Sequence, residues 1–253
     1  MTEARVMRRC SWITPDWPAP PRVRALSTTR DGGVSRPPYE SLNLSDGVGD
    51  SPEAVHANCD RLLVEAGLPR VPVWLRQVHG TGVVYAGEVD AVPEADAVWT
   101  DAPGFACAVL TADCLPVLLC DRSGTSVAAV HAGWRGLAAG VIERTIDAMH
   151  IDGADLLAWL GPAIGPGAFE VGAEVREAFL RTDPGATEAF SEGREGHWMA
   201  DLYRLARRRL NGRGVRDICG GGFCTYGDAE QFYSYRRDGV TGRMATLIWL
   251  EVG

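Results

Sequence analysis

The chain has 253 residues, of which 46% are hydrophobic and 23% charged, and it carries a net charge of −8. This length allows one large domain or two small ones around a sizeable core, while the acidic balance argues against non-specific binding to nucleic acid or to anionic membranes. All 25 basic residues are arginine, so a Schiff-base lysine and a P-loop lysine are both excluded.

The seven cysteines form no CxxC pair, and their number is odd. The N-terminal stretch MTEARVMRRCSW lacks the apolar run of a signal peptide, and no stretch reaches the roughly 18 apolar residues of a membrane span. We therefore expect a cytoplasmic protein with reduced thiols.

The first part of the chain predicts an N-terminal segment over about 1–24, which includes the proline-rich TPDWPAPPR, and an ordered loop over 27–44. A helix is expected next, because Ser51 is a good N-cap, Pro52 suits the first helical position and Gly67 can end the helix.

Strands are expected to dominate the rest of the chain. Short apolar runs that end in polar or glycine-containing turns predict strands within 71–80, 104–121, 125–134, 156–165 and 244–252. Helical spacing of apolar residues predicts helices over 136–149, 173–181 and 202–210. There is no GxGxxG motif, and no linker or repeat divides the chain, so we expect one mixed domain over 1–253 rather than a dinucleotide-binding fold.

Three of the apolar runs end in a side chain that can bind a soft metal, namely His79, Cys114 and His131. Strand ends are where rigid scaffolds display functional groups, and two imidazoles with one thiolate form a ligand set for catalytic zinc. From spacing alone, an alternative stays open, in which two histidines are hydrogen-bonded and Cys114 is a buried core thiol.

Four further residues are candidates for binding or positioning. Asp113 interrupts an apolar run and is predicted either to orient a ligand histidine or to cap a turn. Arg135 follows Gly133 at the start of a predicted helix and could bind phosphate or form a structural ion pair. Arg30 and Asn43 belong to a polar, glycine-bearing loop that could contact a substrate or simply be a hydrogen-bonded surface loop.

Taken together, the motifs STTRDGGVS, YESLNL, RQVHG, ADAVWTD, TADCLPVLLCD, VAAVHAGWRG, WLGPAIGPGAFEVG and FCTYGDAEQFYSYRRDGVTGRMA resemble the YfiH-like or laccase-domain family, and the match runs from about residue 25 to the C-terminus. The family is also known as polyphenol oxidase, purine nucleoside phosphorylase and peptidoglycan editing factor. The resemblance implies an α+β fold, a single-domain four-layer α/β/β/α sandwich with mixed sheets, related to the bacterial cytotoxic-necrotizing-factor deamidases.

The resemblance also implies Zn²⁺, with Cu²⁺ as the other candidate, held by His79, Cys114 and His131, which would then be the catalytic centre. It implies phosphorolysis of adenosine, inosine and methylthioadenosine, and hydrolytic deamination of adenosine, which a zinc-activated water would serve. Purine nucleosides and phosphate are thus the expected partners, with Arg30, Asn43 and Arg135 as candidates to hold them. Leu137 and Gly167-Ala168 depart from the family pattern and put the fit of the substrate in question.

Four other functions remain as alternatives. A multicopper oxidase needs about ten histidines, whereas this chain has 5, so that function is disfavoured. A metal-independent cysteine hydrolase would use Cys114 as nucleophile with His79 or His131 as base. An amidohydrolase that edits peptidoglycan precursors could use the same zinc site, and a non-enzymatic metal-storage or interaction protein would bind metal without turnover.

Overall fold

The apolar runs of the sequence form the strands of two large sheets. The computed structural model describes residues 9–252, so residues 1–8 of the expected N-terminal segment lie outside the described residues. The strands are β1 (Trp12–Ile13), β2 (Val23–Thr28), β3 (Val83–Tyr85), β4 (Ala97–Thr100), β5 (Ala106–Thr111), β6 (Leu115–Asp121), β7 (Val127–Ala132), β8 (Leu156–Leu160), β9 (Glu170–Gly172), β10 (Phe190–Glu192), β11 (His197–Ala200), β12 (Asp217–Gly220) and β13 (Met244–Leu250). The α-helices are α1 (Pro52–Glu65), α2 (Trp134–Ala139), α3 (Val141–Met149), α4 (Ala173–Leu180), α5 (Leu202–Gly212) and α6 (Tyr235–Asp238).

One sheet has four antiparallel strands in the order β1-β2-β13-β5, and the other has six strands in the order β12-β8-β6-β7-β4-β3. The six-stranded sheet is mixed, because β12 pairs with β8 and β3 pairs with β4 in parallel while its other pairs are antiparallel. Strand β6 lies between β7 and β8, and all seven of its residues are buried. The segment that leads into Leu115 is therefore held by the centre of this sheet.

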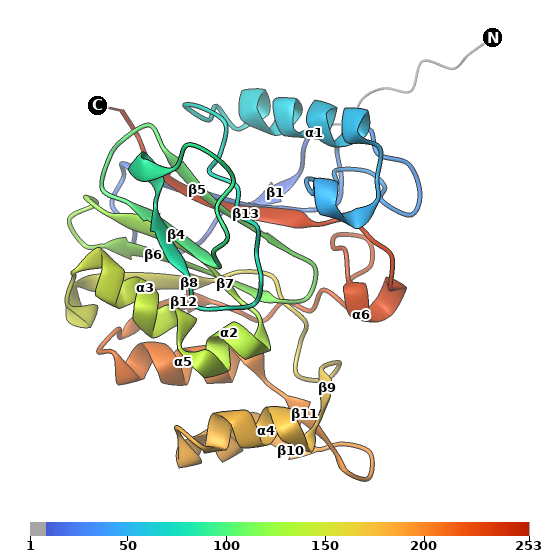
Figure 1. Ribbon diagram of the computed structural model, residues 1–253, viewed down its shortest axis with the longest axis vertical. Coiled ribbons are helices and arrows are strands. Elements are labelled where there is room, and N and C mark those ends of the chain that lie inside the picture. The colour runs from blue at the N-terminus through green and yellow to red at the C-terminus, as the bar shows by residue number, and fades with distance from the viewer. Residues whose placement is uncertain (1–8, 253) are drawn as a thin grey trace.

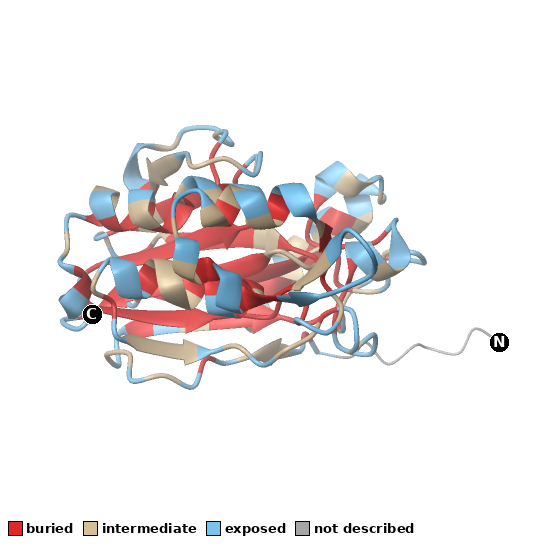
Figure 2. Ribbon diagram, turned by 90° about the horizontal axis from the view of Figure 1, so that it is seen from below, coloured by how far each residue is buried: buried red, intermediate tan, exposed pale blue. Residues whose placement is uncertain are grey.

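The two large sheets face each other, and helices cover their outer faces. Side chains from both sheets share one apolar cluster, including Val109 and Ile248 from one and Leu118 and Ala129 from the other. On the far side of the four-stranded sheet, Leu62 of α1 joins a second cluster, and α2, α3 and α5 contribute to a third cluster on the six-stranded sheet. Figure 1 shows α1 at one side of the sheets and α3 and α5 at the other, and Figure 2 shows the buried strands between them.

The helix predicted after Ser51 is present as α1. The Ser51 hydroxyl accepts a hydrogen bond from the Ala54 N–H, Pro52 is the first helical residue, and Gly67 follows the C-cap with a φ of +62°. The predicted helix over 173–181 is also present as α4, and that over 202–210 as α5. The cap and the apolar spacing were sufficient to place these helices.

Two predictions of local structure were wrong. Residues 71–80 form no strand, and only the isolated bridges Val73–Cys107 and Arg76–Glu94 join this segment to its neighbours. The helix expected over 136–149 is divided into α2 and α3, because Gly140 adopts a φ of +96° and ends the first helix.

A third, three-stranded sheet of β9, β10 and β11 was not predicted. It forms an antiparallel unit in the order β10-β11-β9 and lies beside α4 at the lower end of the molecule in Figure 1. Within residues 9–252, no helix is long and apolar enough to span a bilayer.

Candidate metal centre

The register between β6 and β7 brings Cys114 close to His131. Leu115 pairs with Ala132 and Pro116 with His131, so Cys114, the residue before β6, lies at the edge of the sheet where β7 ends. A methyl group built on Gly133 would lie 3.1 Å from the Cys114 Sγ. Two residues of the predicted donor set are thus placed by the pairing of adjacent strands.

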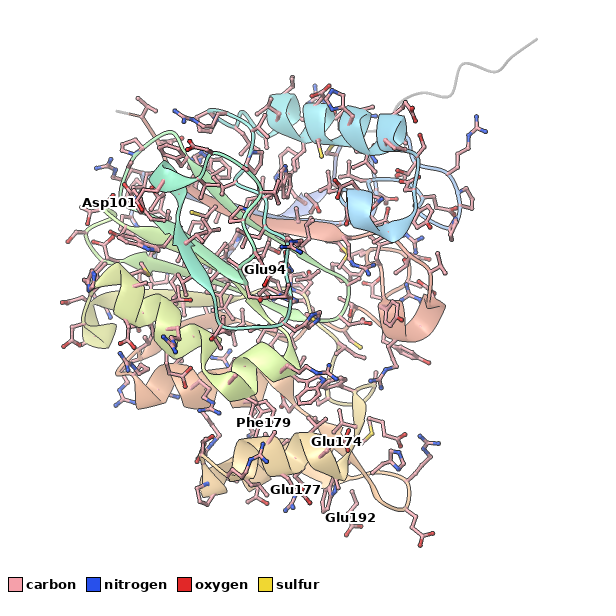
Figure 3. All side chains as sticks on the ribbon, in the orientation of Figure 1. Glu94, Asp101, Glu174, Glu177, Phe179 and Glu192 are labelled. Carbon is pink, nitrogen blue, oxygen red and sulfur yellow. The ribbon has the colours of Figure 1, made fainter. Side chains whose placement is uncertain are left out.

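His79 reaches the same place from a turn that wraps around the carboxylate of Asp96. The backbone N–H groups of Val78, His79 and Gly80 donate to this carboxylate over 3.3, 2.9 and 2.6 Å, and His79 has a φ of +58°. An ion pair of 2.8 Å between Arg76 and Glu94, which is labelled in Figure 3, joins the segment before His79 to the segment before Asp96. Because Asp96 immediately precedes β4, which pairs with β7, the turn is fixed beside His131.

The possible ligand atoms of His79, Cys114 and His131 all lie within 4.8 Å of one another. The Cys114 Sγ is 3.7 Å from the His79 Nε2, and the two imidazole rings lie edge to face with centroids 4.8 Å apart. His131 is buried, Cys114 is half-buried and His79 is exposed, so the cluster reaches solvent on the His79 side. Within residues 9–252 this is the one group of His, Cys, Asp or Glu side chains with such spacing.

Asp96 also fixes the orientation of His131. Its Oδ1 lies 2.7 Å from the His131 Nδ1, and both side chains are buried. An ionised carboxylate can only accept hydrogen bonds, so the His131 Nδ1 carries the proton and donates it to Asp96. This leaves Nε2 as the ring atom available to a metal, which is the usual arrangement of a ligand histidine supported by a carboxylate.

The donor set fits a tetrahedral metal ion. Zinc binds thiolate at about 2.3 Å and imidazole at about 2.0–2.1 Å, so tetrahedral donors lie about 3.3–3.8 Å apart. The 3.7 Å between Cys114 and His79 agrees with this, while the full spread of up to 4.8 Å would have to close slightly around an ion. Three protein ligands leave a fourth position for water or substrate, as in catalytic rather than structural zinc sites.

The charge state of the cluster favours metal binding. Burial alone would raise the pKa of the Cys114 thiol, but the positive charge of His131 and hydrogen bonds with both imidazoles outweigh it and lower the pKa to about 6. For His131, burial would lower the pKa, but the Cys114 thiolate and Asp96 raise it. Without metal, the site therefore holds a thiolate and an imidazolium at neutral pH, and the thiolate is the form that binds metal.

We expect Cys114 to be the first cysteine alkylated when the protein is stripped of metal with a chelator. Its rate of reaction with iodoacetamide should reach half its maximum near pH 6, because the thiolate is the nucleophile. Cys59 serves as the internal control, since burial raises the pKa of its thiol to about 11. Labelling followed by peptide mass spectrometry over a pH series measures both midpoints, and a Cys114 midpoint near that of a free thiol would contradict this electrostatic arrangement.

Two glycines of the motif HAGWRG allow this close approach. A Cβ on Gly133 would lie 2.7 Å from the His79 Cδ2, and one on Gly136 would lie 2.6 Å from the Gly80 carbonyl oxygen. Neither position has room for a side chain unless the turn that carries His79 moves away. The two glycines therefore set the distance between α2 and the His79 turn.

The contact expected of Asp113 is made by Asp96 instead. Asp113 adopts a φ of +102°, and its carboxylate accepts hydrogen bonds from the Thr225 hydroxyl at 2.6 Å and from the Arg236 backbone N–H at 2.7 Å. It thus joins the strand end that carries Cys114 to the 225–236 segment. Sequence reasoning missed Asp96, although an acidic residue directly before the apolar run AVW was an available signal.

Asn43 and Arg30 lie in the predicted polar loop, but most of their polar atoms are engaged within the protein. Asn43 is fully buried; its Oδ1 accepts from the backbone N–H groups of Ser45 and Arg243, and its Nδ2 donates to Ser45 O and to the Asp50 carboxylate. The Arg30 guanidinium donates to the carbonyl oxygens of Glu40 and Ala229. Arg135 is exposed, and its guanidinium lies 4.3 Å from the centroid of the Trp134 ring.

Residues 24–251 match the family described as multi-copper polyphenol oxidoreductase laccase. The chain belongs to this YfiH-like, laccase-domain family. Within the family, it is 57% identical over 242 residues to a purine nucleoside phosphorylase of Pseudomonas aeruginosa, covering 95% of this chain and 99% of the relative. It is 56% identical over 239 residues to the purine nucleoside phosphorylase YfiH of Escherichia coli, covering 94% and 98%.

Solved structures of family members have the same fold. A Neisseria meningitidis protein of the DUF152 family superposes with a TM-score of 0.93 at 52% identity, covering 95% of this chain and 99% of that one. YlmD from Geobacillus stearothermophilus superposes with a TM-score of 0.88 at 32% identity, covering 100% and 98%. The family and its mixed α+β architecture are therefore confirmed.

Proposed function

We propose that this chain is a zinc-dependent purine nucleoside phosphorylase whose metal is held by His79, Cys114 and His131. The observation that carries the proposal is the meeting of these three donors within 4.8 Å in a chain 57% identical to a relative named for that activity. The thiolate and the two imidazoles suit zinc, and a bound zinc would supply an electrophile that stabilises developing negative charge.

The remaining residues of the cluster prepare this site for the metal. Asp96 accepts a hydrogen bond from the His131 Nδ1 and from three N–H groups of the His79 turn, so the His131 ring and the backbone that carries His79 are fixed before any ligand binds. The low pKa of Cys114 supplies a thiolate at neutral pH. Such preorganisation stabilises developing charge without rearrangement during the reaction.

Phosphorolysis requires a phosphate oxygen to form a bond to the ribose C1′ while the bond from C1′ to the purine N9 breaks. The electron pair of that bond passes to the purine, which takes up a proton, and ribose 1-phosphate is the other product. The protein must therefore hold an oxyanion below the ribose and stabilise charge on the leaving base. Without lysine, the permanent side-chain cations that can do this are arginines.

The test is incubation of the purified protein, with its metal content measured, with adenosine in the presence and absence of phosphate. We expect adenine and ribose 1-phosphate to form only when phosphate is present. Inosine and ammonia formed without phosphate would instead assign the site to deamination. If neither set of products forms on a fully metallated protein, the phosphorylase proposal fails, and amide hydrolysis of a peptidoglycan precursor becomes the next substrate to assay.

A metal-independent cysteine hydrolase is the second candidate. Cys114 is hydrogen-bonded to His131, and His131 to Asp96, so the three could act as nucleophile, base and orienting carboxylate. The two candidates respond oppositely to a chelator. A cysteine hydrolase keeps its activity when metal is removed, whereas the phosphorylase proposed here loses it and regains it with added zinc. A multicopper oxidase is not proposed, since the chain has only 5 histidines.

A further inference from the structure

Arg243 lies next to the strand end that leads to Cys114, and it was not among the candidate residues predicted from the sequence. It directly precedes β13, whose first residue Met244 pairs with Thr111, the last residue of β5. Continuing that register places Arg243 opposite Ala112, immediately before Asp113 and Cys114. In agreement with this register, the negative charges of Cys114 and Asp113 favour the charged form of its guanidinium and so act to raise its pKa.

The surrounding loops hold this arginine in place. Its backbone N–H donates to the Asn43 Oδ1 over 3.0 Å, and its Nη1 donates to the carbonyl oxygens of Thr241 at 2.9 Å and Gly242 at 3.0 Å. The guanidinium carbon lies 5.9 Å from the centroid of the Tyr235 ring. The buried Asn43 thus acts on the site indirectly, by fixing the backbone of Arg243.

The guanidinium is half-buried but forms no ion pair with a carboxylate of the described residues. Within residues 9–252, no carboxylate lies within ion-pair distance of Arg243, and neither its Nε nor its Nη2 has a hydrogen-bond acceptor. Burial lowers the pKa of this guanidinium, while Cys114 and Asp113 oppose that effect. Neither Nε nor Nη2 is fully buried, so both N–H groups remain accessible to a ligand from solvent.

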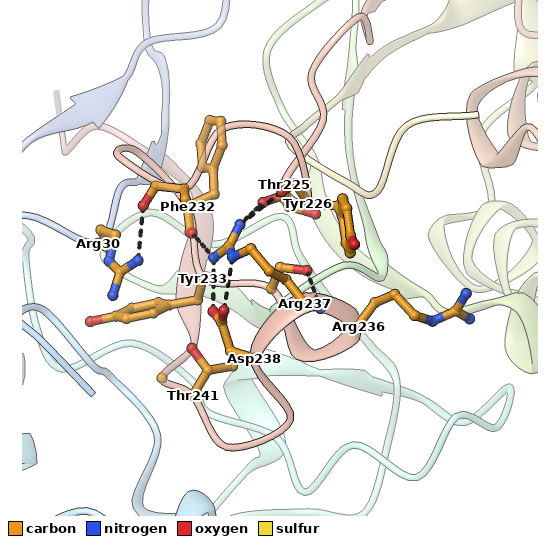
Figure 4. Close-up of polar contacts among 12 residues, drawn as sticks. Arg30, Thr225, Tyr226, Phe232, Tyr233, Arg236, Arg237, Asp238 and Thr241 are labelled. Atoms are coloured by element: carbon orange, nitrogen blue, oxygen red, sulfur yellow. Dashed lines mark hydrogen bonds and ion pairs between the residues drawn. The ribbon is translucent and has the colours of Figure 1, made fainter. Parts of the chain in front are cut away.

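Three other arginines of the surrounding loops donate hydrogen bonds within the protein, whereas Arg135 is exposed and stacks on Trp134. Figure 4 shows that Arg237 is surrounded by acceptors; it bonds to the carbonyls of Thr225, Tyr226 and Phe232 and to the carboxylate of Asp238. Arg236 donates from its side chain to the Glu170 carbonyl oxygen, and Arg30 to two carbonyls. Among these arginines, Arg243 combines a half-buried position with two unused nitrogens, Nε and Nη2, whereas Arg135 and Arg236 are exposed.

We propose that Arg243 binds the phosphate co-substrate, with its free Nε–H and Nη2–H groups donating to two phosphate oxygens beside the metal centre. A guanidinium offers two parallel N–H groups whose spacing matches an oxyanion, so the contact is charge-assisted and bidentate. The choice of phosphate among oxyanions rests on the proposed phosphorylase function, whereas the oxyanion site itself rests on the geometry of Arg243.

The test compares zinc-loaded wild type with Arg243→Gln, Arg243→Lys, Arg135→Gln and Arg144→Gln. Arg144 is exposed on α3 and controls for the loss of one positive charge, and Arg135 is the competing phosphate ligand.

The KM for phosphate is measured at saturating adenosine, and the KM for adenosine at saturating phosphate. Arg243→Gln should raise the phosphate KM about 10- to 100-fold, as expected for loss of charged hydrogen bonds, with a much smaller change in the adenosine KM. Arg243→Lys should give an intermediate value, and it decides the question if Arg243→Gln does not fold.

Equilibrium dialysis with radiolabelled inorganic phosphate, without nucleoside, separates this inference from the proposed function. Phosphate bound by wild type and Arg144→Gln, but not by Arg243→Gln, supports the site even if no phosphorolysis is found. Phosphorolysis with an unchanged phosphate KM in Arg243→Gln would overturn the inference and leave the function standing. A raised phosphate KM in Arg135→Gln alone, or no phosphate binding by wild type, would also overturn it.

Discussion

We expect replacement of Cys114 with alanine to abolish metal binding and, with it, the proposed phosphorylase activity. The thiolate is the anionic member of a three-ligand set, and two imidazoles with water do not hold zinc as tightly at neutral pH. A catalytic metal contributes several kcal/mol to the transition state, so kcat/KM should fall about 1000-fold or more. Metal content per chain, measured on the dialysed protein by atomic emission, should fall from about one equivalent to near zero.

The matched control for this variant is Cys219→Ala, which removes a half-buried thiol from β12 without touching the donor set. It should keep both metal and activity. Equal metal content in wild type and Cys114→Ala would reject the proposed donor set, whatever the activity of the variant.

Replacing Asp96 with asparagine will destabilise the protein and weaken its hold on the metal at the same time. The carboxylate is fully buried and accepts four hydrogen bonds, from Val78, His79 and Gly80 and from the His131 Nδ1. Asparagine keeps one of the two oxygens, and its NH2 group cannot accept the hydrogen bonds made to the other. Loss of this buried charged partner costs about 3–5 kcal/mol in the free energy of unfolding. Because the support of the His131 ring and of the backbone that carries His79 is weakened, metal affinity should fall about 10- to 100-fold.

Urea unfolding of the metal-free protein and chelator competition measure the two effects separately. Burial would raise the pKa of Asp96, but the hydrogen bonds from His131 and the backbone outweigh it and lower the pKa. Its stabilisation is therefore present above the ordinary aspartate range, and the difference between wild type and Asp96→Asn should shrink as the pH falls below that range.

Asp121→Asn provides the control for Asp96→Asn. Asp121 is also a nearly buried carboxylate, which accepts from the backbone N–H groups of Ser123, Thr125 and Ser126 and from the Thr125 hydroxyl. It lies at the opposite end of β6 from Cys114. Its replacement should lower stability and leave metal affinity unchanged, whereas a similar loss of metal affinity in both variants would mean that Asp96 acts only through global stability.

The sequence predicted the elements that have strong local signals. The Ser51 cap with Pro52 located α1, and the apolar runs located β5 to β8 and β13, because both features depend on residues close together in the chain. The three donors were also named correctly as a group that meets in space, but only the resemblance to the family made that prediction specific.

The parts that the sequence did not reveal depend on contacts between distant residues. Asp96 contacts His131 across the β4–β7 pair, and Arg243 lies near Cys114 through the β13–β5 register, neither of which a local pattern encodes. The 71–80 segment reads as a strand by its apolar content, but its N–H groups near His79 bond to a side chain rather than to a neighbouring strand. The relation of the fold to the cytotoxic-necrotizing-factor deamidases stays a prediction.

The three donor residues come from three separate segments of the chain, so they come together only as the chain folds. Cys114 and His131 reach each other only after β6 and β7 have paired, and His79 joins them only after Asp96 has been placed by the pairing of β4 with β7. A nascent chain that has not yet completed β7 contains no assembled pocket for the ion. The proposed ion would therefore bind only after the central strands have assembled, and it would enter from the side of the exposed His79.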